Sequence, residues 1–266
     1  AGLFPYLKFY ESLLQKNGSF KPGLVSNKID ETHHQFISPN KYLIDTWMDT
    51  IQHQILKSPV TEAGKYVYSD NDFIFLGKII EQITGMSLNA FTQQAFYKPL
   101  EMHSTGYLPL EKTTVENIAA TELDGYFRKE LIRGSVHDEG ASTMGGIAGH
   151  AGLFSNATDL AKLYLMLMNK GSWNGKEYIK SSTVANFTSY QNESRRGLGF
   201  DKPEKNNKTS TEPYPSLNAS PSTFGHTGFT GTCVWADPEK GILFIFLSNR
   251  VFPTRDNKAF SALNLR

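Results

Sequence analysis

The stretch "FGHTGFTGTCVWADPEKGILFIFLSNR", residues 224–250, carries the clearest strand signals in the chain. The first run alternates through Thr232, Val234 and Ala236, the segment "DPEKG" supplies a turn, and Ile242 to Leu247 is almost wholly apolar. We therefore predict a β-hairpin whose apolar second strand lies in the centre of a sheet. The glycines of "GHTG", residues 225–228, weaken a strand and leave room for a ligand to approach backbone. This polar segment therefore predicts a binding edge beside the hairpin.

Composition is that of an ordinary globular protein. The chain has 266 residues, of which 39% are hydrophobic and 12% aromatic, so it is long enough for one large domain or two small ones. Its net charge of +1 gives no electrostatic reason to expect nucleic acid or anionic lipid as a partner. No apolar run approaches the roughly 18 residues needed to span a bilayer. The single Cys233 excludes an internal disulfide framework and predicts a packed thiol.

Helical periodicity precedes the predicted hairpin. In the helix near Asp70 we expect the apolar residues to face the core, namely Phe73, Leu76, Ile79, Ile80 and Ile83. Helices first and a hairpin last indicate an α+β or three-layer α/β protein. The predicted helices cover Tyr6–Lys16, a segment opened by Ser38-Pro39 and closed by Pro59, a segment from Asp70 to Gly85, Leu88–Leu100 after Ser87, and a segment between "SNATDL" and Gly171.

One connection stands out by its length and polarity. Residues Asp201 to Thr223 are rich in Pro, Ser and Asn. A loop of this length is rarely a passive turn, so we expect it to border a site or to be mobile.

Three polar stretches lie at the edges of these elements: "YSDN" at 68–71, "GHAGLFSNATDL" at 149–160 and "GHTG" at 225–228. Their order and context resemble the serine β-lactamase and penicillin-binding-protein superfamily, particularly its class-C-like and esterase branch. That family uses a Ser-x-x-Lys nucleophile, a Tyr-x-Asn or Ser-Asp-Asn element, and a Lys-Thr-Gly or His-Thr-Gly strand. The resemblance spans nearly the whole chain. It implies a single domain over residues 1–266, with an antiparallel sheet flanked by helices and a helical subdomain.

Two registers compete for the "YSDN" element. Ser69-Asp70-Asn71 matches the class A form, whereas Tyr68-Ser69-Asp70 matches the Tyr-x-Asn form with Asp in place of Asn. The helix that follows, "DFIFLGKIIEQITG", matches the class-C-like pattern only when Tyr68 leads, so we favour that register. The resemblance then implies that Tyr68 is a catalytic proton carrier, its phenolate favoured by the lysine of Ser-x-x-Lys. Without the resemblance, Tyr68 reads as a half-buried tyrosine at a strand end.

Asp70 departs from the usual Asn of this element. An amide donates and accepts, whereas a carboxylate only accepts, so Asp70 would repel a substrate carboxylate and hold an ammonium group. Its alternative role is to cap the helix that follows. We expect the cap alone, or the cap together with substrate binding.

The resemblance implies roles for the residues of "GHTG" and for Phe229, which follows them. His226 would bind or polarise the substrate as a catalytic residue, with a charge that depends on pH near neutrality. Thr227 would offer its hydroxyl, and Gly228 would let the acyl group lie close. The N–H of Phe229 would donate to the oxyanion. The alternative for His226 is a histidine that caps a strand end.

Other histidines are weaker candidates. His150 is a candidate for lining the substrate pocket, while Ser155 and Asn156 read as helix caps. His137-Asp138 is typical of the same branch and predicts loop structure. No His-Glu-x-x-His spacing occurs among the seven histidines, so we expect no metal and no cofactor.

The nucleophile is the missing part of the pattern. The literal Ser-x-x-Lys is Ser38-Pro39-Asn40-Lys41, which reads as a helix start and lies too close to Tyr68 in the chain. We expect instead that the true serine precedes Ala1, and that the chain as given is nearly inactive.

The sequence therefore predicts most of a serine hydrolase acting by acyl transfer on an ester, a D-amino-acid peptide or a β-lactam. The resemblance implies a bacterial envelope or periplasmic location. The expected partner is a small-molecule or peptide substrate. The alternatives are a catalytically silent domain that binds a wall peptide or a partner protein, and a non-enzymatic module of a larger polypeptide.

Overall fold

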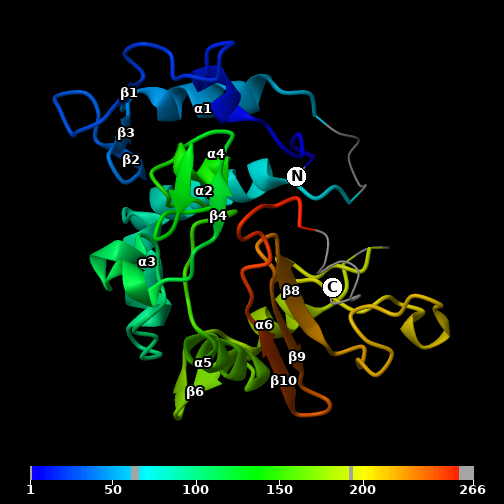
Figure 1. The fold of residues 1–266 in the computed structure, drawn as a ribbon. Coiled ribbons are helices and arrows are strands. Elements are labelled where there is room, and N and C mark those ends of the chain that lie inside the picture. The colour runs from blue at the N-terminus through cyan, green and yellow to red at the C-terminus, as the bar shows by residue number, and fades with distance from the viewer. Residues whose placement is uncertain (1, 61–65, 192–193, 258–266) are drawn as a thin grey trace. The chain divides into compact units, whose positions relative to one another are not determined.

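A computed structural model describes residues 2–60, 66–191 and 194–257 of the chain. The chain folds into two compact units (Figure 1). Unit 1 comprises Ala1–Gln93, Thr105–Phe154 and Phe252–Thr254, and unit 2 comprises Gln94–Ser104, Ser155–Val251 and Arg255–Arg266. The π-helix η2 (Gln93–Tyr97) carries the chain from one to the other.

The described part of unit 1 has more residues in helices than in strands and contains two small antiparallel sheets. In the larger sheet the strand order is β1-β3-β2 (Figure 1). Its elements are the 3-10 helices η1 (Phe9–Leu13), η3 (Pro109–Glu111) and η4 (Val115–Asn117), the α-helices α1 (Trp47–Lys57), α2 (Asp70–Thr84), α3 (Leu88–Thr92) and α4 (Glu139–Ser142), and the strands β1 (Val25–Ser26), β2 (Gln35–Ser38), β3 (Lys41–Leu43), β4 (Glu122–Asp124) and β5 (Glu130–Ile132).

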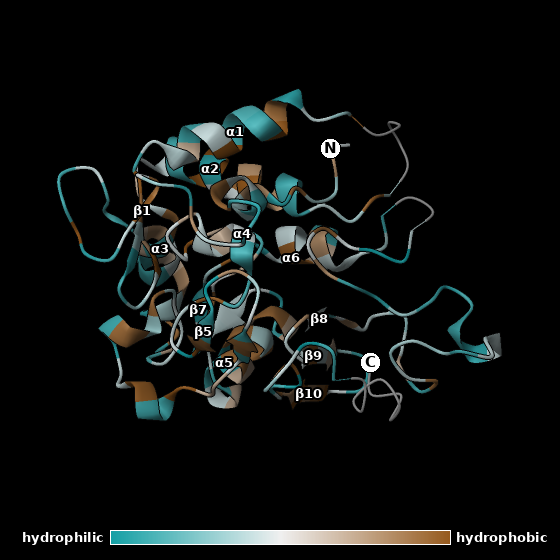
Figure 2. Cartoon of the chain, turned by 45° about the horizontal axis from the view of Figure 1, so that its top comes forward, coloured by the Kyte–Doolittle hydropathy of each residue, from teal (hydrophilic) through white to brown (hydrophobic). Residues whose placement is uncertain are grey.

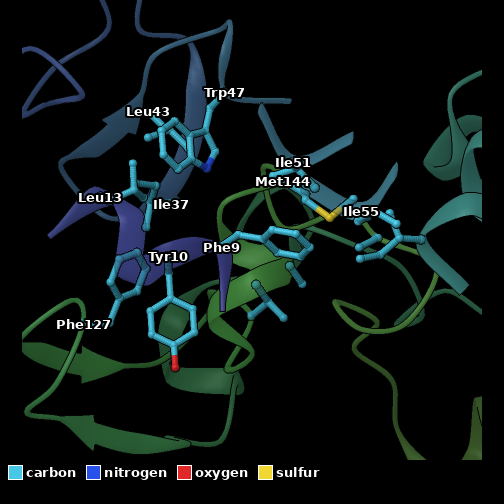
Figure 3. Close-up of a cluster of buried hydrophobic side chains, with 14 residues drawn as sticks. Phe9, Tyr10, Leu13, Ile37, Leu43, Trp47, Ile51, Ile55, Phe127 and Met144 are labelled. Carbon is cyan, nitrogen blue, oxygen red and sulfur yellow. The ribbon is translucent and has the colours of Figure 1, made fainter. Parts of the chain in front are cut away.

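The core of unit 1 joins segments that are far apart in the sequence. Figure 3 shows the η1 side chains Phe9, Tyr10 and Leu13 among side chains from the sheet, from α1 and from the loop after β4. Trp47, Ile51 and Ile55 recur at helical spacing on α1, and each is less than one tenth exposed. Burial of these large apolar groups is the main source of stability in such a core.

Two of the predicted helices are wrong in this unit. Ser38 ends β2, and a turn at Pro39 and Asn40 leads into β3, because Ser38 pairs with Lys41 across a hairpin and Asn40 adopts a left-handed φ of 59°. The helix begins only at Trp47. The predicted helix at residues 6–16 shrinks to η1, because Leu14 is extended and forms a β-bridge with Phe20.

The ends of helix α2 agree with the prediction, but its buried face does not. Gly85 ends the helix in the left-handed conformation at φ 66°. The buried residues are Asn71, Ile74 and Gly77, and the predicted inward stripe is exposed, with Leu76 at 48% and Ile83 at 79%. Gly77 lies against the backbone of Gly149, and this close approach turns the small-residue face inward.

The cap of α2 is also one residue earlier than predicted. Ser69 is the N-cap, and its hydroxyl accepts from the N–H of Asp72 at 3.1 Å. Asp70 is the first helical residue, and at this position the positive end of the helix dipole stabilises its carboxylate. Ser87 caps α3 as predicted, since its hydroxyl accepts from the N–H of Ala90.

Unit 2 contains the predicted hairpin within a three-stranded antiparallel sheet, ordered β10-β9-β8 (Figure 1). The register pairs Ile242 with Asp237, so "DPEKG" forms the turn as predicted. β9 is the central strand, and β10 is an edge in the part of the chain that the structure describes, which corrects its predicted central place. The elements are α5 (Ala157–Met168), α6 (Ser181–Thr188), η5 (Asn207–Thr209), β6 (Ser172–Trp173), β7 (Lys176–Glu177), β8 (Phe224–Gly228), β9 (Thr232–Asp237) and β10 (Ile242–Phe246).

Helix α5 packs against β9 and β10 and completes the core of unit 2. Asn156 is its N-cap and accepts from the N–H of Asp159 at 2.8 Å, as the sequence indicated. At the start of β8 the ring of Phe224 stacks on Tyr164 and meets the ring of Phe200 edge-on. Cys233 is half-buried, and burial raises the pKa of its thiol, consistent with a packed thiol.

The long connection from Asp201 to Thr223 is polar but packed. Figure 2 shows it largely in the hydrophilic colour, in contrast to the hydrophobic β10. Yet Asp201, Lys202 and Thr223 are each at most 2% exposed. Asp201 forms a β-bridge with Gly225, the second residue of β8, so this connection borders the "GHTG" strand.

Candidate active site

The Tyr-Ser-Asp element of unit 1 is held by backbone and side-chain bonds to the segment at Phe4-Pro5. Ser69 Oγ and Asn71 Nδ2 donate to the carbonyl of Phe4 at 3.1 and 2.6 Å, and the N–H of Asp70 donates to the carbonyl of Pro5 at 2.9 Å. Ser69 and Asn71 are buried by these contacts. The side chain of Tyr68 is 54% exposed. Of these three residues, Tyr68 is therefore the one whose side chain is exposed.

Asp70, two residues after Tyr68, interacts with a group of titratable side chains. Burial raises the pKa of the Asp70 carboxyl; His150 opposes this shift and Asp138 reinforces it. His150 is 5% exposed, and its Nε2 lies 3.1 Å from Asp138 Oδ1. Burial alone would raise the pKa of Asp138, but the hydrogen bonds from His150 and from the N–H of Ala141 hold it below its usual range. The electrostatics thus link Asp70, His150 and Asp138, three residues of the predicted motifs.

Asp138 also has the structural role predicted for the His137-Asp138 pair. It is the N-cap of α4, accepting from Ala141 at 2.7 Å. His137 Nε2 lies 2.7 Å from Glu122 Oε2, and both residues are buried. These contacts fix the loop from which Asp138 reaches His150.

In unit 2 the "GHTG" segment is strand β8, paired with β9. His226 is opposite Val234 and Thr227 is opposite Cys233. The space that a side chain would fill at Gly225 is taken by the carbonyl of Val234, and at Gly228 by the hydroxyl of Thr232. These two glycines therefore permit close strand pairing. Phe229 follows the strand, and the guanidinium of Arg250 lies 4.9 Å from the centre of its ring.

Arg196 adds a charged group that the sequence motifs did not reveal. Its Nη1 lies 3.1 Å from His226 Nε2, and its Nε lies 3.4 Å from Asp201 Oδ1. Asp201 is 1% exposed and also pairs with Arg195 and accepts from the hydroxyl of Tyr214 at 2.8 Å. The signal in the sequence was the pair Arg195-Arg196 ahead of the acidic start of the polar connection.

The literal Ser-x-x-Lys has the wrong geometry for a nucleophile. Ser38 is 0% exposed, and Lys41 forms an ion pair with Glu130. Both lie in a hairpin, whereas the prediction placed them at a helix start. Tyr68 belongs to unit 1 and His226 to unit 2, so their juxtaposition stays a prediction, as do the substrate roles of Asp70, His150, Thr227, Gly228 and Phe229.

Comparison with known proteins shows the family to which the chain belongs. A family model described as Beta-lactamase matches residues 17–264. The chain belongs to this family. A protein of Salmonella enteritidis PT4 described as "Putative D-alanyl-D-alanine carboxypeptidase" is 39% identical over 216 residues, covering 76% of this chain and 49% of the relative. The chain thus spans about half the length of the curated relatives it matches.

Solved structures of this superfamily share the fold. The octameric penicillin-binding protein homologue of Pyrococcus abyssi gives a TM-score of 0.54 at 20% identity, over 82% of this chain and 46% of that one. A penicillin-binding protein of Bacillus halodurans gives 0.52 at 13% identity, over 76% and 58%. The predicted α/β fold and the resemblance to the β-lactamase and penicillin-binding-protein superfamily are therefore confirmed.

Metal ligands and membrane spans are both absent from the part of the chain that the structure describes. In residues 2–60, 66–191 and 194–257, no three His, Cys, Asp or Glu side chains gather as metal ligands would. No described helix is both long and apolar enough to cross a bilayer.

Proposed function

We propose that the protein to which this chain belongs is a serine hydrolase that works through an acyl-enzyme. The observation that carries the proposal is the exposed phenol of Tyr68 on a Tyr-Ser-Asp element whose Ser69 and Asn71 are fixed to Phe4. Family membership supplies the reaction class. We further propose that the two units belong to one catalytic domain, to which Tyr68 and His226 both contribute.

The proposed steps follow from acyl transfer. The serine hydroxyl gives its proton to the phenolate of Tyr68 as its oxygen bonds to the substrate carbonyl carbon. The bond to the leaving group then breaks, and Tyr68 returns the proton to that group. The N–H of Phe229 would stabilise the oxyanion, an interaction whose loss typically costs about 2.7–4 kcal/mol. Water finally releases the acyl group, while Thr227, Gly228, Asp70 and His150 position the substrate.

Among the candidate substrates, a D-amino-acid peptide has the best support. Arg196 places a guanidinium beside His226 on the β8 strand. A guanidinium is well suited to a terminal carboxylate, which such a peptide carries and a simple ester lacks. The name of the Salmonella relative is consistent with this choice and with action at the cell envelope.

We also propose that the nucleophile is not Ser38, because that side chain is buried in the β2–β3 hairpin. The serine would come from the parent protein outside residues 1–266. Loss of a catalytic serine typically costs on the order of 10⁶-fold in rate, so the chain alone would be nearly inactive. If the parent protein has no such serine, the second candidate, a silent wall-peptide binder, takes its place.

The test is labelling of the full-length protein with a fluorophosphonate or penicillin probe, followed by peptide mapping. We expect a labelled serine outside these residues and hydrolysis of a D-alanyl-D-alanine peptide. Tyr68→Phe should lower hydrolysis about 10²- to 10⁴-fold, while the matched control Tyr66→Phe, two residues earlier and 52% exposed, should not. Absence of labelling would favour the binder, and labelled Ser38 would refute the assignment of the nucleophile.

A further inference from the structure

The hydrogen bonds of His226 determine where its proton lies. An arginine side chain only donates hydrogen bonds, so the contact of 3.1 Å from Arg196 Nη1 requires His226 Nε2 to accept. A backbone carbonyl only accepts, so the contact of 2.6 Å between His226 Nδ1 and the carbonyl of Thr227 requires Nδ1 to donate. Only the neutral ring with its proton on Nδ1 satisfies both contacts.

The guanidinium that faces His226 is itself held in place. Arg196 Nε is 3.4 Å from Asp201 Oδ1, and the Arg196 side chain is 17% exposed. The backbone of Asp201 bridges Gly225, one residue before His226. Arg196 is therefore fixed between the buried carboxylate of Asp201 and the imidazole of His226, whose backbone segments are paired through Gly225.

We propose that Arg196, and not the imidazole of His226, carries the positive charge of this part of unit 2, and that Arg196 fixes His226 as the neutral Nδ1–H tautomer. A proton added to Nε2 would remove the acceptor for Arg196 and place two cations side by side. Arginine stays protonated at every pH at which the protein is folded. The positive charge offered to a ligand would then come from the guanidinium rather than from the imidazole.

The surroundings of the pair are consistent with this assignment. The carboxylates in the cluster are engaged by arginine: Asp201 by Arg195 and Arg196, and Glu204 by Arg195 Nε at 3.0 Å. Opposite His226 on β9 stands Val234, which has no charge. Among the described contacts, Arg195, Asp201, Glu204 and Tyr214 are the other charged or titratable side chains of this group, and Cys233 lies opposite Thr227 on β9.

Arg196 is in this view a positioning residue for His226 and the specificity-determining cation for an anionic substrate group. The second role rests on the proposed hydrolase function, because only a bound substrate would meet that charge. The tautomer does not depend on it and is measurable on the chain itself.

The test is ¹⁵N NMR of the histidine side chains in the labelled chain, with the His226 signals identified by their loss in His226→Gln. We expect a protonated, pyrrole-type Nδ1 and an unprotonated, pyridine-type Nε2. Arg196→Met should shift both signals towards values averaged over the two neutral tautomers. Arg196→Lys should recover part of the wild-type pattern, and the matched control Arg195→Met should leave it unchanged.

The wild-type spectrum, with its His226 signals identified through His226→Gln, is the primary readout. A protonated Nε2 on His226 would overturn the inference, as would signals that Arg196→Met leaves in place or that Arg195→Met shifts equally. If the tautomer is as proposed but the full-length protein hydrolyses no D-amino-acid peptide, the proposed function fails alone. If hydrolysis occurs with a protonated Nε2, the present inference fails alone.

Discussion

The ion pair between Arg128 and Asp124 is the most completely buried charge pair that the structure describes. Both side chains are 0% exposed, and Arg128 Nε lies 3.0 Å from Asp124 Oδ2. The other guanidinium nitrogens donate to the carbonyls of Val136 and His137. These carbonyls immediately precede Asp138, so the pair holds the loop that presents Asp138 to His150.

Arg128→Met should therefore destabilise unit 1 strongly. The substitution leaves the Asp124 carboxylate with three backbone N–H donors, those of residues 126, 127 and 128, and with no opposite charge. It also leaves two buried carbonyls without their donors. Removing one partner of a buried ion pair typically costs about 3–5 kcal/mol. That loss is a large part of the about 5–15 kcal/mol by which domains are stable.

The measurement is urea unfolding of the whole chain, followed by tryptophan fluorescence in a Trp173→Phe, Trp235→Phe background. The chain has three tryptophans, so Trp47, buried in the core of unit 1, then reports that unit alone. The matched control is Arg133→Met. Arg133 is less buried and its guanidinium bonds only to backbone carbonyls in the contacts described, so we expect a loss of about 1 kcal/mol. A loss for Arg128→Met no larger than that of the control would refute the reasoning.

Three further outcomes follow from the same contacts. Despite burial, hydrogen bonds from the backbone and from Arg128 hold the pKa of Asp124 below its usual range, so the stability that Asp124 contributes is present above about pH 4 and is lost as pH falls further. The free energy of unfolding, measured in urea, should therefore fall less steeply with decreasing pH in Arg128→Met than in the wild type. Equal slopes would contradict this prediction. Gly149→Ala should cost well over 2 kcal/mol in thermal unfolding, because its methyl group would overlap a carbonyl of α2, whereas Gly85→Ala, at φ 66° in open space, should cost about 1 kcal/mol. Burial lowers the pKa of Lys202 to about 8, so between pH 8 and 10.5 the unfolded chain binds more protons than the folded chain. The free energy of unfolding should therefore rise with pH in this range relative to Lys202→Met, and equal slopes for the two proteins would contradict the prediction.

The elements that the sequence predicted well carry local signals. Helix α2 ends at a glycine that adopts the left-handed conformation, and its start coincides with a serine and acidic residues. The β9–β10 hairpin has a turn segment of five residues between two runs of strand formers. In both cases residues within a few positions of each other fix the boundary, so no knowledge of distant partners was needed.

The elements that failed depend on distant partners. "SPNK" fits a helix start and a hairpin turn equally well, and the pairing of β2 with β3 decides for the turn. On α2 the apolar stripe through Leu76 and Ile83 predicted the buried face, but periodicity identifies an apolar face without its partner. Gly77 meets Gly149, more than seventy positions later, and this contact buries the opposite face.

In the candidate site, too, the sequence reveals the local motif but not the distant residue that contacts it. The His-Thr-Gly motif was visible in the sequence, and the resemblance implied a role for His226. The tautomer that we propose for that ring, however, rests on contacts with Arg196, thirty positions earlier, and with a carbonyl one residue later. Motif spacing gives no sign of Arg196, because the contact arises only when Asp201 bridges Gly225 at the start of β8. A replacement of lysine by histidine in such a motif therefore does not imply a loss of positive charge when a nearby arginine supplies it.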